Sequence, residues 1–290
     1  MKKVAIIQAR MGSTRLPGKV FKPIAHYPML QWVIESTNKA STLDEIVIAT
    51  TTLPEDERIV SFCQEHTIPC CRGSETDLLD RYYQTALERQ ASIIVRITSD
   101  CPLMDPVLID QIMTTYLDMK EVDYVSNVLP PRTFPRGLDI EVFSFHALEK
   151  AWKEDLNPAW REHVTPYIHF HPELFRCHGV TYSPDLSHLR WTVDTLEDLT
   201  LIQKMGDSFQ RFNFSWQEVL TLLGEHPDWQ EIKKQFQIDL TQPDALSKFA
   251  ENFMQGQTQN TSSQAKSSSY DSTRPTHSSV QTSGVEDLSH

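Results

Sequence analysis

The stretch that decides the fold is residues 4–19, which read VAIIQARMGSTRLPGK. It starts with a short apolar run, mostly β-branched, which is typical of a fully buried strand. It then carries three cations, Arg10, Arg15 and Lys19, among small residues and proline. Small residues let a backbone come close to a ligand, and the cations suit phosphate oxygens. Because open α/β sheets bind nucleotides beyond the carboxyl ends of their strands, we expect an anion-binding loop here.

The loop differs from two known phosphate-binding motifs. Five residues separate Gly12 from Gly18, where a Walker A loop has four, and Val20 stands where Ser or Thr would hold magnesium. It has no GxGxxG pattern either. The alternative interpretation is a surface loop with solvated cations, but the cations, the glycines and the buried strand together favour ligand binding.

The composition excludes several classes of function. The chain has 290 residues and a net charge of −12, which argues against nonspecific binding of nucleic acid or of an anionic membrane surface. Five cysteines without a CxxC spacing predict neither a disulfide framework nor a zinc site, and fit a reducing cytoplasm. No signal peptide or membrane-spanning segment is expected.

Strand and helix patterns alternate over the first 127 residues. After the first strand, strands are predicted at 46–50, 68–71, 93–98 and 122–127, and helices at 28–40, 54–66, 74–90 and 106–119. This alternation predicts βαβ units and a largely parallel sheet covered on both faces.

The alternation of strands and helices ends at Pro130. Residues 138–143 alternate with period two, which indicates an antiparallel or edge strand. Further helices are predicted at 145–154, 160–169, 195–205, 216–223 and 229–236, and strands at 174–182 and 189–193. Residues 241–290 are predicted to form a disordered Ser/Thr-rich tail, because they cannot bury enough apolar surface, which leaves one domain over residues 1–240.

Carboxylates at strand ends are the candidates for metal binding. Asp100 follows a buried strand and suits magnesium, although a turn or cap role before Pro102 fits the residue type equally well. Asp194 with Glu197 has the spacing of a helix capping box. Because Asp100 and Asp194 both follow predicted strands, we expect them to meet at one crevice.

Asp139 and Glu141 form a second carboxylate pair. Residues two apart share one face of a strand. The Asp-x-Glu pattern therefore has two interpretations, a glycosyltransferase-like metal motif and the solvated face of an edge strand.

Several motifs resemble one superfamily. The pattern ARxGSxRLPGK at residues 9–19 resembles the signature loop of the sugar-acid cytidylyltransferases, which include CMP-sialate synthetases and 3-deoxy-manno-octulosonate cytidylyltransferases. SDxPL at residues 99–103 and TVDTxEDL at residues 192–199 resemble the metal-binding motifs of that family. REHVTPY at residues 161–167 is similar to the spore-coat polysaccharide biosynthesis protein F group, which the pattern from about Lys2 to Met205 resembles most.

This resemblance implies a fold and a reaction. The fold is a Rossmann-like three-layer α/β/α sandwich of the nucleotide-diphospho-sugar transferase type, mostly parallel, with an antiparallel excursion at about 130–182. The reaction is transfer of CMP from CTP to a nonulosonate- or octulosonate-like sugar acid, giving a CMP-sugar and pyrophosphate for surface polysaccharide biosynthesis. It also implies Mg²⁺ as cofactor, a homodimer and a cytoplasmic location.

The resemblance implies roles for the matching residues of this chain. It implies catalytic roles for Arg10, Lys19 and Asp100. It implies nucleotide binding by Ala9, Arg10, Gly12, Ser13, Arg15, Lys19, Arg72 and Gly73. It implies sugar contacts by Arg136, Asp139 and Glu141, and magnesium binding by Asp100 and Asp194.

Two other functions stay open at this point. A GT-A-like glycosyltransferase would use Asp139 and Glu141 to consume a nucleotide-sugar, and a nucleotide sensor would bind without catalysis. A loop with three cations favours a triphosphate over the diphosphate of a nucleotide-sugar.

Overall fold

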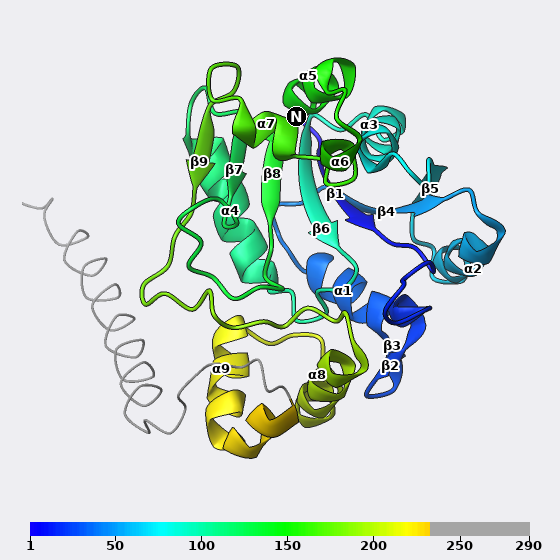
Figure 1. The fold of residues 1–290 in the computed structure, drawn as a ribbon, viewed down its shortest axis with the longest axis vertical. Helices are drawn as coiled ribbons and strands as arrows, with labels where there is room; N and C mark the ends of the chain where they lie inside the picture. Colours follow the sequence, from blue (N-terminus) through cyan, green and yellow to red (C-terminus); the bar gives the residue numbers. More distant parts are fainter. Residues whose placement is uncertain (233–290) are drawn as a thin grey trace, which may run out of the picture. The chain divides into compact units, whose positions relative to one another are not determined.

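The computed structural model of this chain describes residues 1–232, and the predicted tail lies outside that range. The apolar run forms β1 (Lys3–Gln8) in the middle of a sheet. It pairs in parallel with β4 (Glu45–Thr51) on one side and with β6 (Ile93–Thr98) on the other. The carboxyl ends of these three strands therefore lie side by side at one edge of the sheet (Figure 1).

The sheet has seven strands in the order β5-β4-β1-β6-β8-β7-β9. The remaining strands are β5 (Cys70–Gly73), β7 (Tyr124–Ser126), β8 (Glu141–Ser144) and β9 (Cys177–Gly179). Only β8 runs antiparallel to its neighbours, β6 and β7. The mostly parallel sheet with an antiparallel excursion is therefore confirmed.

Helices cover both faces of the sheet. One face carries α3 (Leu78–Glu88), α5 (Phe145–Glu154) and α7 (Pro166–Phe170). The other carries α1 (Met29–Thr37) and α4 (Pro106–Asp118), while α2 (Glu57–Glu65) packs against β4 and β5 (Figure 1). The predicted three-layer α/β/α sandwich is confirmed.

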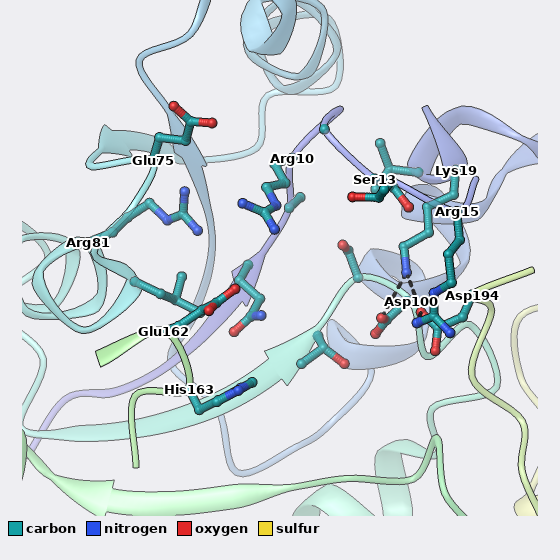
Figure 2. Close-up of a pocket in the computed structure, with 18 of the residues that line it drawn as sticks. Arg10, Ser13, Arg15, Lys19, Glu75, Arg81, Asp100, Glu162, His163 and Asp194 are labelled. Atoms are coloured by element: carbon teal, nitrogen blue, oxygen red, sulfur yellow. Dashed lines mark hydrogen bonds and ion pairs between the residues drawn. The ribbon is translucent and has the colours of Figure 1, made fainter. Parts of the chain in front are cut away.

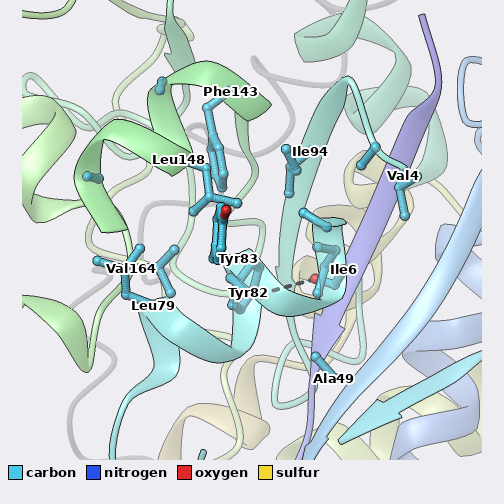
Figure 3. Close-up of a cluster of buried hydrophobic side chains, with 14 of the residues drawn as sticks. Val4, Ile6, Ala49, Leu79, Tyr82, Tyr83, Ile94, Phe143, Leu148 and Val164 are labelled. Carbon is cyan, nitrogen blue, oxygen red and sulfur yellow. Dashed lines mark hydrogen bonds between the residues drawn. The ribbon is translucent and has the colours of Figure 1, made fainter. Parts of the chain in front are cut away.

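The core under α3 connects the sheet to the cavity described below. Val4 and Ile6 of β1 point into it together with Ile94 of β6 and Tyr82 of α3 (Figure 3). The fully buried Tyr82 hydroxyl donates to the carbonyl oxygen of Ile6 at 3.1 Å and also to the side chain of Gln8. A helix that packs on the sheet therefore also holds the end of β1.

Two predicted elements of the second half are wrong. Residues 189–193 are not a strand, since they make one isolated bridge, between Arg190 and Arg136, and otherwise run as extended chain. The helix expected at 160–169 is two short ones, α6 (Pro158–Arg161) and α7, separated by a turn at residues 162–165. Pro166 explains the interruption, because proline lacks the N–H that a continuing helix requires.

The segment after residue 193 closes the fold. It contains α8 (Leu196–Phe209) and α9 (Trp216–Glu225), followed by a 3-10 helix at Pro227–Ile232. The last four residues of the helix predicted at 229–236 lie outside the described residues. Gly206 of α8 lies against Ile24 of the small hairpin formed by β2 (Pro23–Ile24) and β3 (Tyr27–Pro28). A Cβ atom at Gly206 would come within 2.3 Å of Ile24 Cγ2, so glycine is required for this contact.

Candidate active site

The loop after β1 folds back on itself. The carbonyl oxygen of Met11 accepts bonds from the N–H groups of Ser13 at 2.9 Å and Gly18 at 3.0 Å. Gly18 has φ +65°, a left-handed conformation that glycine adopts without strain. The chain then enters a 3-10 turn at Lys19–Phe21, which aims the Lys19 side chain back across the loop.

A buried carboxylate holds this loop in place. Asp56, which is fully buried, accepts a hydrogen bond from the Met11 N–H at 2.6 Å and another from the Thr51 hydroxyl. Asp56 is thus a positioning residue that sequence reasoning missed.

The loop forms one wall of a cavity of about 530 Å³. The predicted nucleotide-binding residues of the loop line it together with Ala9, namely Arg10, Gly12, Ser13, Arg15 and Lys19. Asp100 and Asp194 line the same end as Lys19, and Arg81 and Glu75 lie toward the other end, with Arg10 between them (Figure 2). The structure therefore brings the predicted loop residues and both predicted metal ligands into one site.

Lys19 lies at the centre of three oxygen atoms. Its Nζ is 3.0 Å from Asp100 Oδ2, 3.0 Å from Asp194 Oδ1 and 2.8 Å from the carbonyl oxygen of Val193 (Figure 2). Burial opposes the charge on Lys19, but Asp100 and then Asp194 outweigh it and raise its pKa. The ammonium stays charged and holds the two carboxylates together.

Asp194 also faces two arginines. Arg15 lies 3.2 Å from its Oδ1, and Arg190 bonds to its Oδ2. Burial would raise the pKa of Asp194, but Lys19, Arg15 and Arg190 lower it below the ordinary value. The carboxylate is therefore ionised, and both of its oxygen atoms are paired with cationic side chains.

The predicted capping role of Asp194 is wrong. Helix α8 is capped by Thr195, whose hydroxyl accepts from the Asp198 N–H while Asp198 accepts from the N–H groups of Thr195 and Asp194. The capping box is thus shifted by one residue from the predicted pair. Asp194 meets Asp100 because the Val193 N–H bonds to the carbonyl oxygen of Asp100 at 2.9 Å, and not because both follow strands.

Arg72 and Gly73 do not line the cavity. Arg72 bonds to Glu57 at 2.6 Å and to the carbonyl oxygens of Thr51 and Leu53. Gly73 instead makes room for Arg81, because a Cβ atom there would lie 3.0 Å from Arg81 Cγ. Later residues of the same segment reach the cavity, namely Glu75, Thr76, Leu78 and Arg81.

Arg81 is a buried guanidinium to which the sequence assigned no role of its own. It is 4% exposed, donates to the Ser74 carbonyl oxygen at 3.1 Å and has no partner for its Nε among residues 1–232. Burial lowers its pKa, and the neighbouring Arg10 contributes to that shift. Two guanidinium groups thus approach each other at the cavity, an arrangement that an anion would stabilise.

The predicted sugar contacts lie outside the cavity lining. Asp139 pairs with Arg132, and the exposed Arg136 bonds through its backbone to Leu189. Glu141 is 4% exposed and bonds to Arg96, to the Tyr124 hydroxyl at 2.7 Å and to the Thr165 hydroxyl. Asp139 and Glu141 thus do not converge, which removes the main support for the glycosyltransferase alternative.

Glu141 compensates a cation beneath the cavity. Burial would raise its pKa, but Arg96 and the bonds from Thr165 and Tyr124 lower it. Arg96 lines the cavity and Glu141 does not. Glu141 therefore affects the site only by holding the Arg96 side chain in place and balancing its charge.

The fold and this cavity define a nucleotide-binding α/β protein, and comparison with known proteins names its family. The family model for cytidylyltransferases matches residues 4–242. The chain is 34% identical over 236 residues to the spore coat polysaccharide biosynthesis protein SpsF of Bacillus subtilis, covering 77% of this chain and 94% of that one. A solved cytidylyltransferase from Leptospira borgpetersenii is 33% identical, with a TM-score of 0.75 over 79% of this chain and 96% of that one.

A shorter match adds a second group of relatives. The 3-deoxy-manno-octulosonate cytidylyltransferase of Trichlorobacter lovleyi is 38% identical over 120 residues, 40% of this chain and 46% of that one. The chain belongs to the cytidylyltransferase family, and it is a nucleotidyltransferase.

Two further predictions concern the whole chain. All five cysteines are free thiols. Within residues 1–232, no helix combines the length and the apolar character needed to cross a bilayer.

Proposed function

We propose that this protein transfers CMP from CTP to a sugar acid and releases pyrophosphate, in a pathway that builds a surface polysaccharide. The observation that carries the proposal is the joining of a three-cation loop and two carboxylates in one cavity. The names of the SpsF and octulosonate relatives support the sugar acid and the polysaccharide.

The reaction is a displacement at the α-phosphorus. A sugar hydroxyl oxygen, expected to be the anomeric one, forms a bond to the α-phosphorus of CTP as the bond to the β-phosphate oxygen breaks. The hydroxyl proton is released, and pyrophosphate leaves. Arg10, Arg15 and Lys19 would neutralise the triphosphate and the departing pyrophosphate, since phosphoryl transfer depends mainly on positioning and on charge stabilisation.

The site fits a magnesium ion. Three oxygen atoms, from Asp100, Asp194 and the Val193 carbonyl, converge within 3.0 Å of one cationic atom, the Lys19 Nζ. Magnesium prefers hard oxygen ligands and takes one or two carboxylates together with phosphate oxygens. Asp100 and Asp194 would hold the ion, which when bound would screen the charge of the phosphates.

Pyrophosphate release tests the proposal. The full chain is incubated with Mg²⁺, each of the four ribonucleoside triphosphates and each of two keto-sugar acids, 3-deoxy-manno-octulosonate and N-acetylneuraminate. We expect release that requires both CTP and a sugar acid. Release without any acceptor, or with another triphosphate in preference to CTP, would contradict the proposal.

A further inference from the structure

The turn between α6 and α7 carries two polar side chains that have no partner in the described part of the chain. Glu162 and His163 both line the cavity. Neither side chain makes a hydrogen bond or an ion pair within residues 1–232, and both are exposed. Figure 2 places them on the side of the cavity away from the Ser13–Lys19 loop.

The residues on either side of this pair are held firmly. Arg161 bonds to Asp77 at 2.8 Å and to the carbonyl oxygens of Trp152 at 3.0 Å and Asp155 at 2.8 Å. Thr165 donates to Glu141 at 2.5 Å, which joins the turn to the ion pair with Arg96. The two unpartnered side chains therefore lie on a rigid support.

The backbone of the turn is strained. Val164 is fully buried and has φ +70°, a conformation that is unfavourable for a β-branched residue. Such strain persists only where the surroundings impose it, and it concentrates at ligand-binding positions. Here it turns the chain so that residue 162 and residue 163 face the cavity while Val164 packs inward.

The chemistry of the pair suits a hydroxyl-rich ligand. A carboxylate accepts hydrogen bonds from hydroxyl groups, and an imidazole both donates and accepts them. Glu162 would repel a triphosphate, which the cations Arg10, Arg15 and Lys19 of the loop attract instead. The two walls of the cavity are thus suited to different substrates.

We propose that the turn at residues 162–165 is the acceptor-binding element of this enzyme, with Glu162 and His163 binding hydroxyl groups of the sugar acid. This inference rests on the proposed function and makes it more specific. It moves acceptor recognition from residues 136–141 to this turn, and it makes Arg161, Thr165 and Glu141 positioning residues.

Steady-state kinetics of Glu162→Gln and His163→Gln test the inference in the full chain with Mg²⁺. The probes are CTP with whichever of 3-deoxy-manno-octulosonate and N-acetylneuraminate the wild type uses. Loss of a hydrogen bond to the Glu162 carboxylate predicts a rise of about tenfold or more in KM for the acid, and loss of a bond to the His163 imidazole predicts a rise of about threefold or more. KM for CTP should stay within about twofold of the wild-type value, because these variants weaken binding of the sugar acid and leave the nucleotide contacts unchanged.

Two surface variants serve as matched controls. Glu173→Gln and His188→Gln make the same chemical changes at exposed positions outside the cavity, and both should leave the two KM values unchanged. Calorimetric titration with CTP provides a second measurement, and the affinity of all four variants should equal that of the wild type.

The outcomes separate the two proposals. A higher KM for CTP with an unchanged KM for the acid would assign the turn to the nucleotide and overturn the inference. Unchanged values for both substrates would overturn it as well. A wild type that transfers CMP to neither acid would refute the proposed function, and the inference would fall with it.

Discussion

Replacing Lys19 by Met should make the free enzyme bind Mn²⁺ more tightly. In the structure the Lys19 ammonium lies 3.0 Å from an oxygen of each carboxylate that would bind the metal. At an effective dielectric constant of about 20, each of these pairs has a Coulomb energy of about 5.5 kcal/mol. If only a quarter of one pair energy opposes metal entry, about 1.4 kcal/mol, its removal strengthens binding about tenfold. Methionine keeps much of the volume of lysine without its charge.

Electron paramagnetic resonance of free Mn²⁺ measures this affinity without nucleotide. We expect weak binding by the wild type and about tenfold or more tighter binding by Lys19→Met. Lys22→Met removes an exposed lysine just after the 3-10 turn and should behave as wild type. Adding Asp100→Asn to Lys19→Met should abolish the gain. A Lys19→Met affinity equal to or weaker than that of the wild type would refute the reasoning.

Three further predictions concern single residues. Asp194→Asn should abolish most of the turnover. It should lower the free energy of unfolding by only about 1 kcal/mol, because Thr195 and not Asp194 caps α8. Folding lowers the pKa of Asp194, so the wild type should be more stable than Asp194→Asn above about pH 4, and the difference should disappear as the pH falls further. Urea titrations of the wild type and the variant at several pH values measure this difference. Glu141→Gln should lower the free energy of unfolding by about 3–5 kcal/mol, because it leaves the Arg96 charge buried and unpaired; a stability equal to wild type would contradict this. Gly206→Ala should lower the unfolding free energy by about 1–3 kcal/mol through overpacking, whereas Gly224→Ala on the exposed side of α9 should not lower it, as thermal melts would report.

The sequence predicted an element well wherever the signals for that element are local. β6 and α5 begin and end at the predicted residues, since a buried apolar run and an amphipathic period are read from neighbouring residues alone. The strand predicted at 189–193 failed for the opposite reason. Its residues are apolar and β-branched enough for a strand, but a strand needs a partner, and tertiary packing offers these residues a single bridge.

The candidate site was predicted where the chain carries a dense motif. The loop cations, Asp100 and Asp194 were found in this way, and the structure brings them together. Arg81, Asp56, Glu162 and His163 were not assigned roles, because each looks like an ordinary helix or turn residue until its surroundings are known. The one available signal was the REHVTPY pattern at residues 161–167, which had no chemical interpretation without the cavity beside it.

The contact between Lys19 and Asp194 joins residues 175 positions apart in the chain. During synthesis on the ribosome, the loop after β1 emerges early, yet its carboxylate partner exists only after more than two-thirds of the protein has been made. A chain that stops short of residue 193 contains β1, β4 and β6 but leaves Arg15 without its carboxylate and Lys19 with Asp100 alone. The two-carboxylate site should therefore be absent from such nascent fragments and form only once the segment before α8 has docked, so that tight metal binding reports completion of the site.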